Sequence, residues 1–267
     1  MKEILNEWKR FVNESKGNPL QLEIDLEKDE IILYHVGWLR PDKPFGIHTK
    51  HMFSGEPKAH SNMKRPLGNE SVYFSSSRAG AEIYKKYSEF PFLHKVKIPI
   101  SKLAGAILED NIQRALERGV TASEEDFRAF AEQTKQNYNT DYGAEYQNLG
   151  VSLEVGVFDT SIIERIDAEP LFEVENLRKY FDKVIDRINR TINTPRNEEG
   201  KFQVKGVFGP KLYDNANMLM RIEDTIERYT HNSKERSKIK TFQYYFPGEW
   251  EALMEKVEQF KQSLGGS

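Results

Sequence analysis

The chain has 267 residues, which is enough for one large domain or for a domain with an appendage. Its 39 basic and 42 acidic side chains leave a net charge of −3, which excludes a strongly basic protein that binds polyanions over its whole surface. There is no cysteine, so disulfides, thiolate catalysis and cysteine-ligated zinc are excluded. No apolar run approaches the roughly 20 residues that cross a bilayer, and the N-terminus lacks the apolar block of a signal peptide. We therefore expect a cytoplasmic protein with no membrane partner.

The first third of the chain mixes helix and strand patterns. Apolar residues at helical spacing predict a helix over 3–14, alternation predicts a strand over 20–26, and an apolar run predicts a second strand over 31–37. Residues 38–70 are rich in proline, glycine and basic side chains and have no period. A long loop in a compact domain is usually functional or mobile, and 38–70 is a candidate lid over a bound ligand, a role that the sequence leaves open.

The middle of the chain continues this mixed pattern. Residues 71–90 predict a strand that turns through three serines into a helix, and 93–100 predict another strand. Ser123 followed by acidic residues predicts a capped helix. A polar, tyrosine-rich segment at 137–150 precedes a predicted strand at 151–160.

After Pro170 the pattern becomes helical, with predicted helices over 175–192, 214–230 and 248–264. We therefore expect an α+β domain over 1–170 and a mostly helical C-terminal region over 171–267.

Three polar residues interrupt otherwise apolar strands: His35, Tyr73 and Glu154. A buried strand avoids a carboxylate unless it is paired or has a function. The order of His35, Tyr73 with Tyr84, and Glu154 resembles the histidine–tyrosine–glutamate branch of the ADP-ribosyltransferase superfamily. That group includes diphtheria toxin and the poly-ADP-ribose polymerases. The resemblance covers roughly residues 30–165.

The resemblance implies a split β-sheet core flanked by helices, and an enzyme that transfers ADP-ribose from NAD to a macromolecule. NAD is then a substrate, and no metal is required. His35 would bind the adenosine-side ribose, Gly37 the nicotinamide carboxamide, and Ser75 with its neighbours Ser76 and Ser77 the polar parts of the dinucleotide. The rings of Tyr73 and Tyr84 would pack the nicotinamide. Glu154 would bind the nicotinamide-side ribose and stabilise the oxocarbenium-like transition state.

Two positions depart from the family pattern: Val36 follows the histidine in place of glycine, and Ser152 stands two residues before Glu154. Members that act on arginine carry glutamate there, and several that act on other acceptors carry glutamine, so Ser152 argues against those acceptors. The family places its acceptor-recognition loop just before the glutamate, which implies that Tyr146, Gln147, Asn148 and Ser152 recognise the acceptor.

The nature of the acceptor is inferred from polar and aromatic residues. The segment 137–150, and the basic, aromatic segment 234–246, slightly favour RNA or DNA over protein. The alternative for 234–246 is a loop whose aromatic side chains turn inward. By analogy, the chain is a toxin or a phage-conflict effector, which implies a neutralising antitoxin as partner.

Other interpretations remain open. His35, Tyr73 and Tyr84 also suit an ordinary core, Glu154 a structural pair with Arg165 or a lysine, and the serines a helix cap. Metal binding by His48, His51 and His60 is disfavoured, because no acidic partner has a suitable spacing. A module that binds NAD or ADP-ribose without chemistry, and an NAD glycohydrolase, are the alternative functions.

Overall fold

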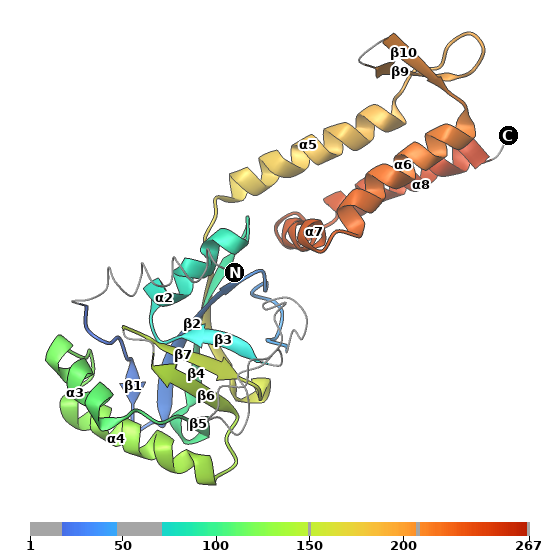
Figure 1. Cartoon of the computed structure of the whole chain (residues 1–267). Helices are drawn as coiled ribbons and strands as arrows, with labels where there is room; N and C mark the ends of the chain where they lie inside the picture. Colours follow the sequence, from blue (N-terminus) through green and yellow to red (C-terminus); the bar gives the residue numbers. More distant parts are fainter. Residues whose placement is uncertain (1–17, 47–70, 149–150, 207–208, 266–267) are drawn as a thin grey trace. The chain divides into compact units, whose positions relative to one another are not determined.

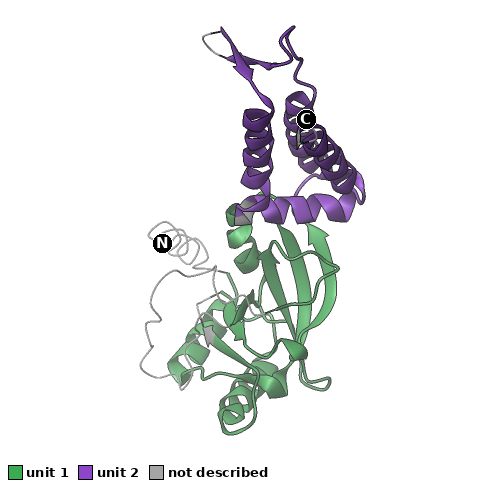
Figure 2. Cartoon of the chain, turned by 90° about the vertical axis from the view of Figure 1, so that its right-hand side faces the viewer, with its two compact units in different colours: residues 1–171 green, residues 172–267 purple. Residues whose placement is uncertain are grey.

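The computed structural model describes residues 18–46, 71–148, 151–206 and 209–265. The chain divides into two compact units, residues 1–171 and 172–267, so the division falls one residue from the expected boundary (Figure 2). The predicted helix at 3–14 and most of the predicted lid lie outside the described residues. None of the helices in the described ranges is long and apolar enough to cross a membrane.

Unit 1 is an α+β structure built on one mixed sheet (Figure 1). Its strand order is β5-β6-β7-β3-β2-β4-β8, with β1 added to β2, and of the paired strands in the described ranges only β5 and β6 are parallel. The strands are β1 (Ile24–Asp25), β2 (Glu30–Gly37), β3 (Val72–Ser75), β4 (Phe92–Pro99), β5 (Leu103–Ala104), β6 (Ala144–Asn148), β7 (Leu153–Val157) and β8 (Glu164–Pro170). The helices are α2 (Arg78–Glu82), which continues as a 3₁₀ turn over Ile83–Tyr87, α3 (Glu109–Arg118) and α4 (Glu124–Gln136).

The core of unit 1 lies between the sheet and the pair α3 and α4. Alternate residues of β2 and β4 point into it, among them Leu33 and Val96, both fully buried. Phe127 and Phe130 of α4 meet them from the helical side and are also fully buried. The strands that carry the predicted site are therefore fixed from one face by close packing.

The sheet is least continuous between β2 and β3. These strands pair at one position, Tyr34 with Ser75, whereas β2 pairs with β4 along its whole length from Glu30 to Gly37. The sequence predicted a split sheet. In the described residues the strands form one sheet, whose two parts are joined between β2 and β3 by a single residue pair.

Several predicted elements are confirmed, and others need correction. The strands at 31–37 and 93–100 and the helix after Ser123 are present, and Ser123 caps that helix by accepting from the backbone N–H of Asp126. The predicted strand 20–26 is reduced to β1 and a bridge between Leu20 and Val120. The predicted loop at 137–150 contains the strand β6, and β8 was not predicted.

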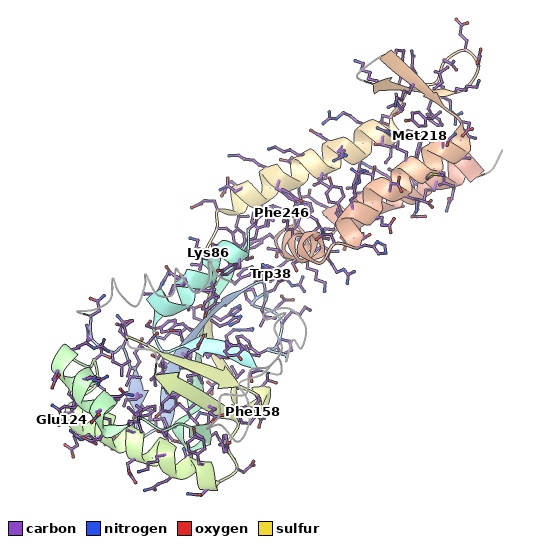
Figure 3. The ribbon with its side chains drawn as sticks, viewed as in Figure 1. Trp38, Lys86, Glu124, Phe158, Met218 and Phe246 are labelled. Atoms are coloured by element: carbon purple, nitrogen blue, oxygen red, sulfur yellow. The ribbon has the colours of Figure 1, made fainter. Side chains whose placement is uncertain are left out.

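Unit 2 consists of α5 (Val174–Ile192), α6 (Asn215–Thr230), α7 (Ser233–Tyr245), α8 (Glu249–Gly265) and a hairpin of β9 (Phe202–Gly206) and β10 (Gly209–Tyr213). The three predicted C-terminal helices are confirmed, whereas the hairpin was not predicted. Met218 of α6 is fully buried and packs with Phe202 of the hairpin and Leu264 of α8 (Figure 3).

The basic, aromatic segment 234–246 forms helix α7, not a loop. Phe242 is fully buried and stacks on Phe181 of α5 with ring centroids 4.1 Å apart. Lys238 pairs with Glu235 at 2.9 Å and lies over the ring of Tyr180. These side chains stabilise unit 2 internally, which matches the alternative of inward-turned aromatics more closely than an open nucleic-acid surface.

Candidate functional site

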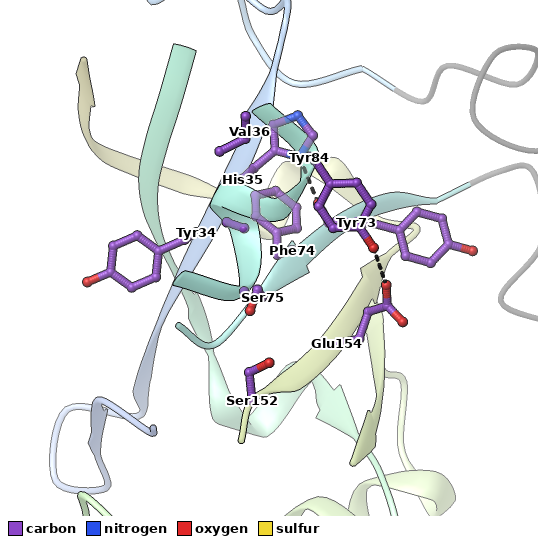
Figure 4. Close-up of a pocket in the computed structure, with 11 residues that line it drawn as sticks. Tyr34, His35, Val36, Tyr73, Phe74, Ser75, Tyr84, Ser152 and Glu154 are labelled. Carbon is purple, nitrogen blue, oxygen red and sulfur yellow. Dashed lines mark hydrogen bonds between the residues drawn. The ribbon is translucent and has the colours of Figure 1, made fainter. Parts of the chain in front are cut away.

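A pocket of about 480 Å³, part of it open to solvent, lies over the strands β2, β3 and β7 and beside α2 (Figure 4). It brings together six of the predicted site residues, from positions far apart in the sequence. The lining consists of Tyr34, His35, Val36, Tyr73, Phe74, Ser75, Gly80, Ala81, Tyr84, Ser152 and Glu154.

The sheet order explains why these residues meet. The glutamate strand β7, the tyrosine strand β3 and the histidine strand β2 are consecutive neighbours. Ser75 is the link, because it pairs with Glu154 on one side and with Tyr34 on the other. Residues opposite one another in antiparallel strands share a face, so Glu154 and Ser75 face the same side of the sheet.

Glu154 is half-buried and is held by a tyrosine. The hydroxyl of Tyr84 donates to its Oε1 across 3.1 Å. No lysine or arginine in the described ranges forms an ion pair with Glu154, and Arg165, the cation suggested by the sequence, donates instead to the carbonyls of Pro41 and Lys43. Burial raises the pKa of the Glu154 carboxyl, and the bond from Tyr84 offsets part of that rise.

Both site tyrosines remain protonated at neutral pH. Burial, assisted by the nearby charge of Glu154, raises the pKa of Tyr73 to about 12. The same two causes, in the same order, raise the pKa of Tyr84, with its bond to Glu154 adding to them. Tyr84 is therefore a permanent hydrogen-bond donor to the carboxylate.

The ring of His35 has a defined orientation. Its Nδ1 lies 2.7 Å from the carbonyl oxygen of Tyr73. Because a carbonyl only accepts, Nδ1 carries the hydrogen, and in the neutral ring Nε2 carries the lone pair. A Cβ at Gly37 would lie 2.7 Å from Nε2, so glycine leaves room for this ring. Gly37 does not line the pocket, and its expected contact with a carboxamide stays a prediction.

The three serines of the corner have different roles. Ser77 caps α2 by accepting from the N–H of Gly80, and Ser76 donates to the carbonyl of Gln21 while accepting from the N–H of Leu153. Both are structural: Ser77 is the helix cap that the sequence offered as an alternative, whereas Ser76 links the corner to Gln21 and to β7. Ser75 alone of the three lines the pocket.

Gly80 of α2 and Val36 of β2 determine how closely α2 packs against the sheet beside the pocket. A Cβ at Gly80 would lie 2.3 Å from Oγ of Ser75 and 3.0 Å from Oγ of Ser152, so the helix approaches the sheet closely only because this residue is glycine. Val36 of β2 is buried against Ala81 of α2, so its side chain serves the packing of this helix.

The predicted acceptor residues are not brought together at the pocket. Tyr146 lies in the core, stacks on Phe130, and shares a 2.8 Å hydrogen bond with the hydroxyl of Thr134. A ring in this position is closed off from an acceptor, so its predicted role is corrected to a structural one. Gln147 pairs with Glu154 through the backbone, and the side chains of Gln147 and Asn148 lie outside the described residues. Ser152 lines the pocket but is only 1% exposed.

Three residues that the sequence did not single out for the site surround His35. Phe45, Phe74 and His94 place their ring centroids 5.8, 5.4 and 6.0 Å from that of His35. The predicted non-ligands His48, His51 and His60 lie outside the described residues, and the side chains of the described ranges form no group suited to a metal ion.

Comparison of the chain with family models, curated proteins and solved structures gives no match.

Proposed function

We propose that the chain is a mono-ADP-ribosyltransferase of the histidine–tyrosine–glutamate kind, with the fold of that superfamily, and that it transfers ADP-ribose from NAD to a macromolecule. The observation that carries the proposal is the half-buried carboxylate of Glu154, held by Tyr84 in a pocket that His35 and Tyr73 also line. A carboxylate that burial disfavours, with no cation paired to it among the described residues, is expensive in a purely structural role.

The geometry supports a binding role for the histidine and the tyrosines. Nε2 of a neutral His35 accepts a hydrogen bond from a ribose hydroxyl. Tyr73 and Tyr84 offer aromatic faces to the nicotinamide ring, where offset stacking is worth about 0.5–1.5 kcal/mol beyond area burial.

The reaction needs one localised negative charge. The bond between the ribose C1′ and the nicotinamide nitrogen breaks, its electron pair leaves with neutral nicotinamide, and positive charge develops on the ribose. Glu154 accepts a hydrogen bond from a ribose hydroxyl and stabilises that charge, and its partly desolvated position strengthens the effect. The acceptor then forms the new bond to C1′ and releases its proton.

Two segments of the sequence, 137–150 and 234–246, favour nucleic acid as the acceptor through their polar and aromatic residues. Within the first segment the ring of Tyr146 is buried and bound to Thr134, and the second segment forms helix α7 with Phe242 buried, so these parts have structural roles. RNA or DNA remains the proposed acceptor, and protein is the alternative. A neutralising antitoxin is proposed only by analogy with toxins of this kind.

The test is incubation of the chain with adenylate-labelled NAD and, separately, total RNA, single-stranded DNA, duplex DNA and a protein extract free of nucleic acid. Glu154→Gln is the test variant, and Glu125→Gln, an exposed residue of α4, is the matched control. Label fixed to one fraction by the wild type and the control, and lost in Glu154→Gln, supports the transferase and names the acceptor.

Two other outcomes would change the assignment. Free ADP-ribose and nicotinamide without labelled macromolecule would indicate an NAD glycohydrolase. NAD that binds in calorimetry but is never consumed would indicate a binding module.

A further inference from the structure

The pairing of β8 with β4 is irregular at one point. Lys95 pairs with Asp167 and Val96 pairs with Arg165, so Ile166 is an extra residue on β8. Such a β-bulge changes which face the following side chains occupy, because side chains alternate along a strand. In a regular ladder Ile166 would lie opposite Val96, and Arg165 would lie opposite Lys97 on the other face.

The bulge exchanges an apolar residue for a charged one on the core face. Ile166 is 48% exposed, whereas Arg165 shares the face of Val96, which is fully buried. Burial lowers the pKa of the Arg165 guanidinium, with the charge of Asp42 opposing this in part. Hydrophobic burial favours the opposite arrangement, with the isoleucine inside and the arginine outside. Positions that break this rule are often functional.

The guanidinium of Arg165 is used to hold the segment that follows β2. It donates from Nη1 to the carbonyl of Pro41 and from Nη2 to the carbonyl of Lys43, the latter across 2.7 Å. Its central carbon lies 4.8 Å from the ring centroid of Phe45, a cation–π distance. One side chain thus fixes the backbone and an aromatic ring of the Leu39–Phe45 segment.

His94 holds the other end of this segment. Its Nε2 lies 2.8 Å from the carbonyl of Leu39, so Nε2 carries the hydrogen, while Nδ1 is buried without a hydrogen-bond partner in the described ranges. Burial, with the neighbouring His35 as a smaller cause, lowers the pKa of His94 to about 3, so this ring is neutral at physiological pH.

Both Arg165 and His94 contact groups that lie against His35. His94 is the direct cross-strand partner of His35, and Phe45 lies edge-on to both rings, 5.8 Å from His35 and 5.2 Å from His94. Phe45 also packs 5.3 Å from Phe74 of β3. Phe45 therefore closes the side of the His35 ring, and Arg165 and His94 hold Phe45 there.

We infer that Arg165 and His94 are positioning residues, which hold the Leu39–Phe45 segment against His35 and thereby fix its ring with Nδ1 on the Tyr73 carbonyl. The effect on catalysis rests on the proposed function, but the effect on the ring of His35 does not. Neither residue lines the pocket, so their substitution acts through His35 and not through direct contact with a ligand.

The test combines tautomer measurement with kinetics on the full chain. Arg165→Lys keeps the charge but cannot reach both carbonyls, and His94→Phe keeps a ring but loses the donor to Leu39. Arg128→Lys is the matched control, because Arg128 binds Glu109 and Glu124 on the helices of unit 1. ¹⁵N–¹H spectra of labelled histidine report which ring nitrogen of His35 carries the hydrogen.

We expect His35 to show hydrogen on Nδ1 in the wild type and in Arg128→Lys, and a mixture of tautomers in Arg165→Lys and His94→Phe. In the proposed reaction kcat/KM for NAD should fall by about 100-fold, since a displacement of about 1 Å can cause such a loss. An unchanged His35 spectrum in folded Arg165→Lys and His94→Phe overturns the inference. If either variant does not fold, Phe45→Leu tests the same contact with His35.

The two proposals fail in distinguishable ways. A His35 tautomer that changes in the variants, in a protein that never consumes NAD, supports the positioning role and rejects the transferase. A His35 tautomer that does not change in the variants, in a protein that transfers ADP-ribose, rejects the positioning role and supports the transferase.

Discussion

Tyr84 donates its hydroxyl hydrogen to Oε1 of Glu154 across 3.1 Å, although the two residues lie 70 positions apart in the chain. The bond joins the turn after α2 to the strand β7, across the intervening strand β3. It orients the carboxylate and, because Tyr84 stays protonated, it favours the ionised form. The bond from Tyr84 therefore opposes the effect of burial on the pKa of Glu154 and favours the ionised carboxylate, which the proposed reaction needs.

Replacing Glu154 with glutamine should abolish transfer while the fold survives. The amide keeps an oxygen for the Tyr84 hydroxyl but carries no charge, and loss of such electrostatic stabilisation costs at least about 100-fold in kcat. The measurement is NAD consumption with the acceptor present, beside circular dichroism of the variant. Full activity in a folded Glu154→Gln protein would reject the assignment.

The same substitution should stabilise the protein at neutral pH. Burial raises the folded-state pKa of Glu154, so the folded protein binds more protons there than the unfolded chain does. Wild-type stability therefore falls as pH rises from the unfolded carboxyl pKa of about 4.3 through the raised value. Thermal melts at pH 7 and pH 4 should show a higher Tm for Glu154→Gln at pH 7 and a smaller difference at pH 4.

Replacing Tyr84 with phenylalanine should move the acid limb of the pH–activity profile to higher pH. The hydroxyl bond lowers the pKa of Glu154, so its removal raises that pKa further and a higher pH is needed to ionise the acid. A hydrogen bond to a charged group is worth about 1.5–3 kcal/mol. The measurement is kcat/KM for NAD against pH.

Tyr87→Phe is the control for this profile. Tyr87 lies 6.3 Å from Tyr84 by ring centroids and is 41% exposed, but its hydroxyl is not the one bound to Glu154. An acid limb that moves equally in both variants would show that the bond to Glu154 does not set the profile.

Site residues that lie on regular strands could be picked out from the sequence more easily than those in irregular segments. His35, Tyr73 and Glu154 stand on strands whose apolar pattern is clear, and an interruption of such a pattern is visible without coordinates. The role of Ser77 was also open to prediction, since a serine before a helix is a common cap.

The support around His35 could not be predicted in the same way. Arg165 faces inward only because Ile166 forms a bulge, and an alternating pattern read from the sequence gives no sign of that extra residue. His94 stands in a strand that was predicted, but its partner, the carbonyl of Leu39, lies in an aperiodic segment. Tyr146 was misassigned because tyrosine in a polar segment suits both a recognition loop and a strand that turns one ring inward.

Replacing Tyr146 with phenylalanine tests that correction. The variant loses the bond to Thr134 but keeps the buried ring, so we expect a loss of about 1 kcal/mol in the free energy of unfolding. Acceptor preference should not change, because the ring is enclosed by the core. Denaturant unfolding and the labelled-NAD assay on each nucleic-acid fraction measure the two effects. A change of acceptor at unchanged stability would restore the recognition role.

Replacing Gly80 with alanine should destabilise unit 1 and narrow the pocket, because the new Cβ would lie 2.3 Å from Oγ of Ser75. Overpacking of this kind costs about 1–3 kcal/mol in the free energy of unfolding. Ser75→Ala removes the oxygen that the Cβ meets, so the double variant should be more stable than the sum of the single effects predicts. Denaturant unfolding of the four proteins gives this coupling energy. Additive effects would mean that α2 moves away from the sheet as a whole, and that the contact between Gly80 and Ser75 does not set the depth of the pocket.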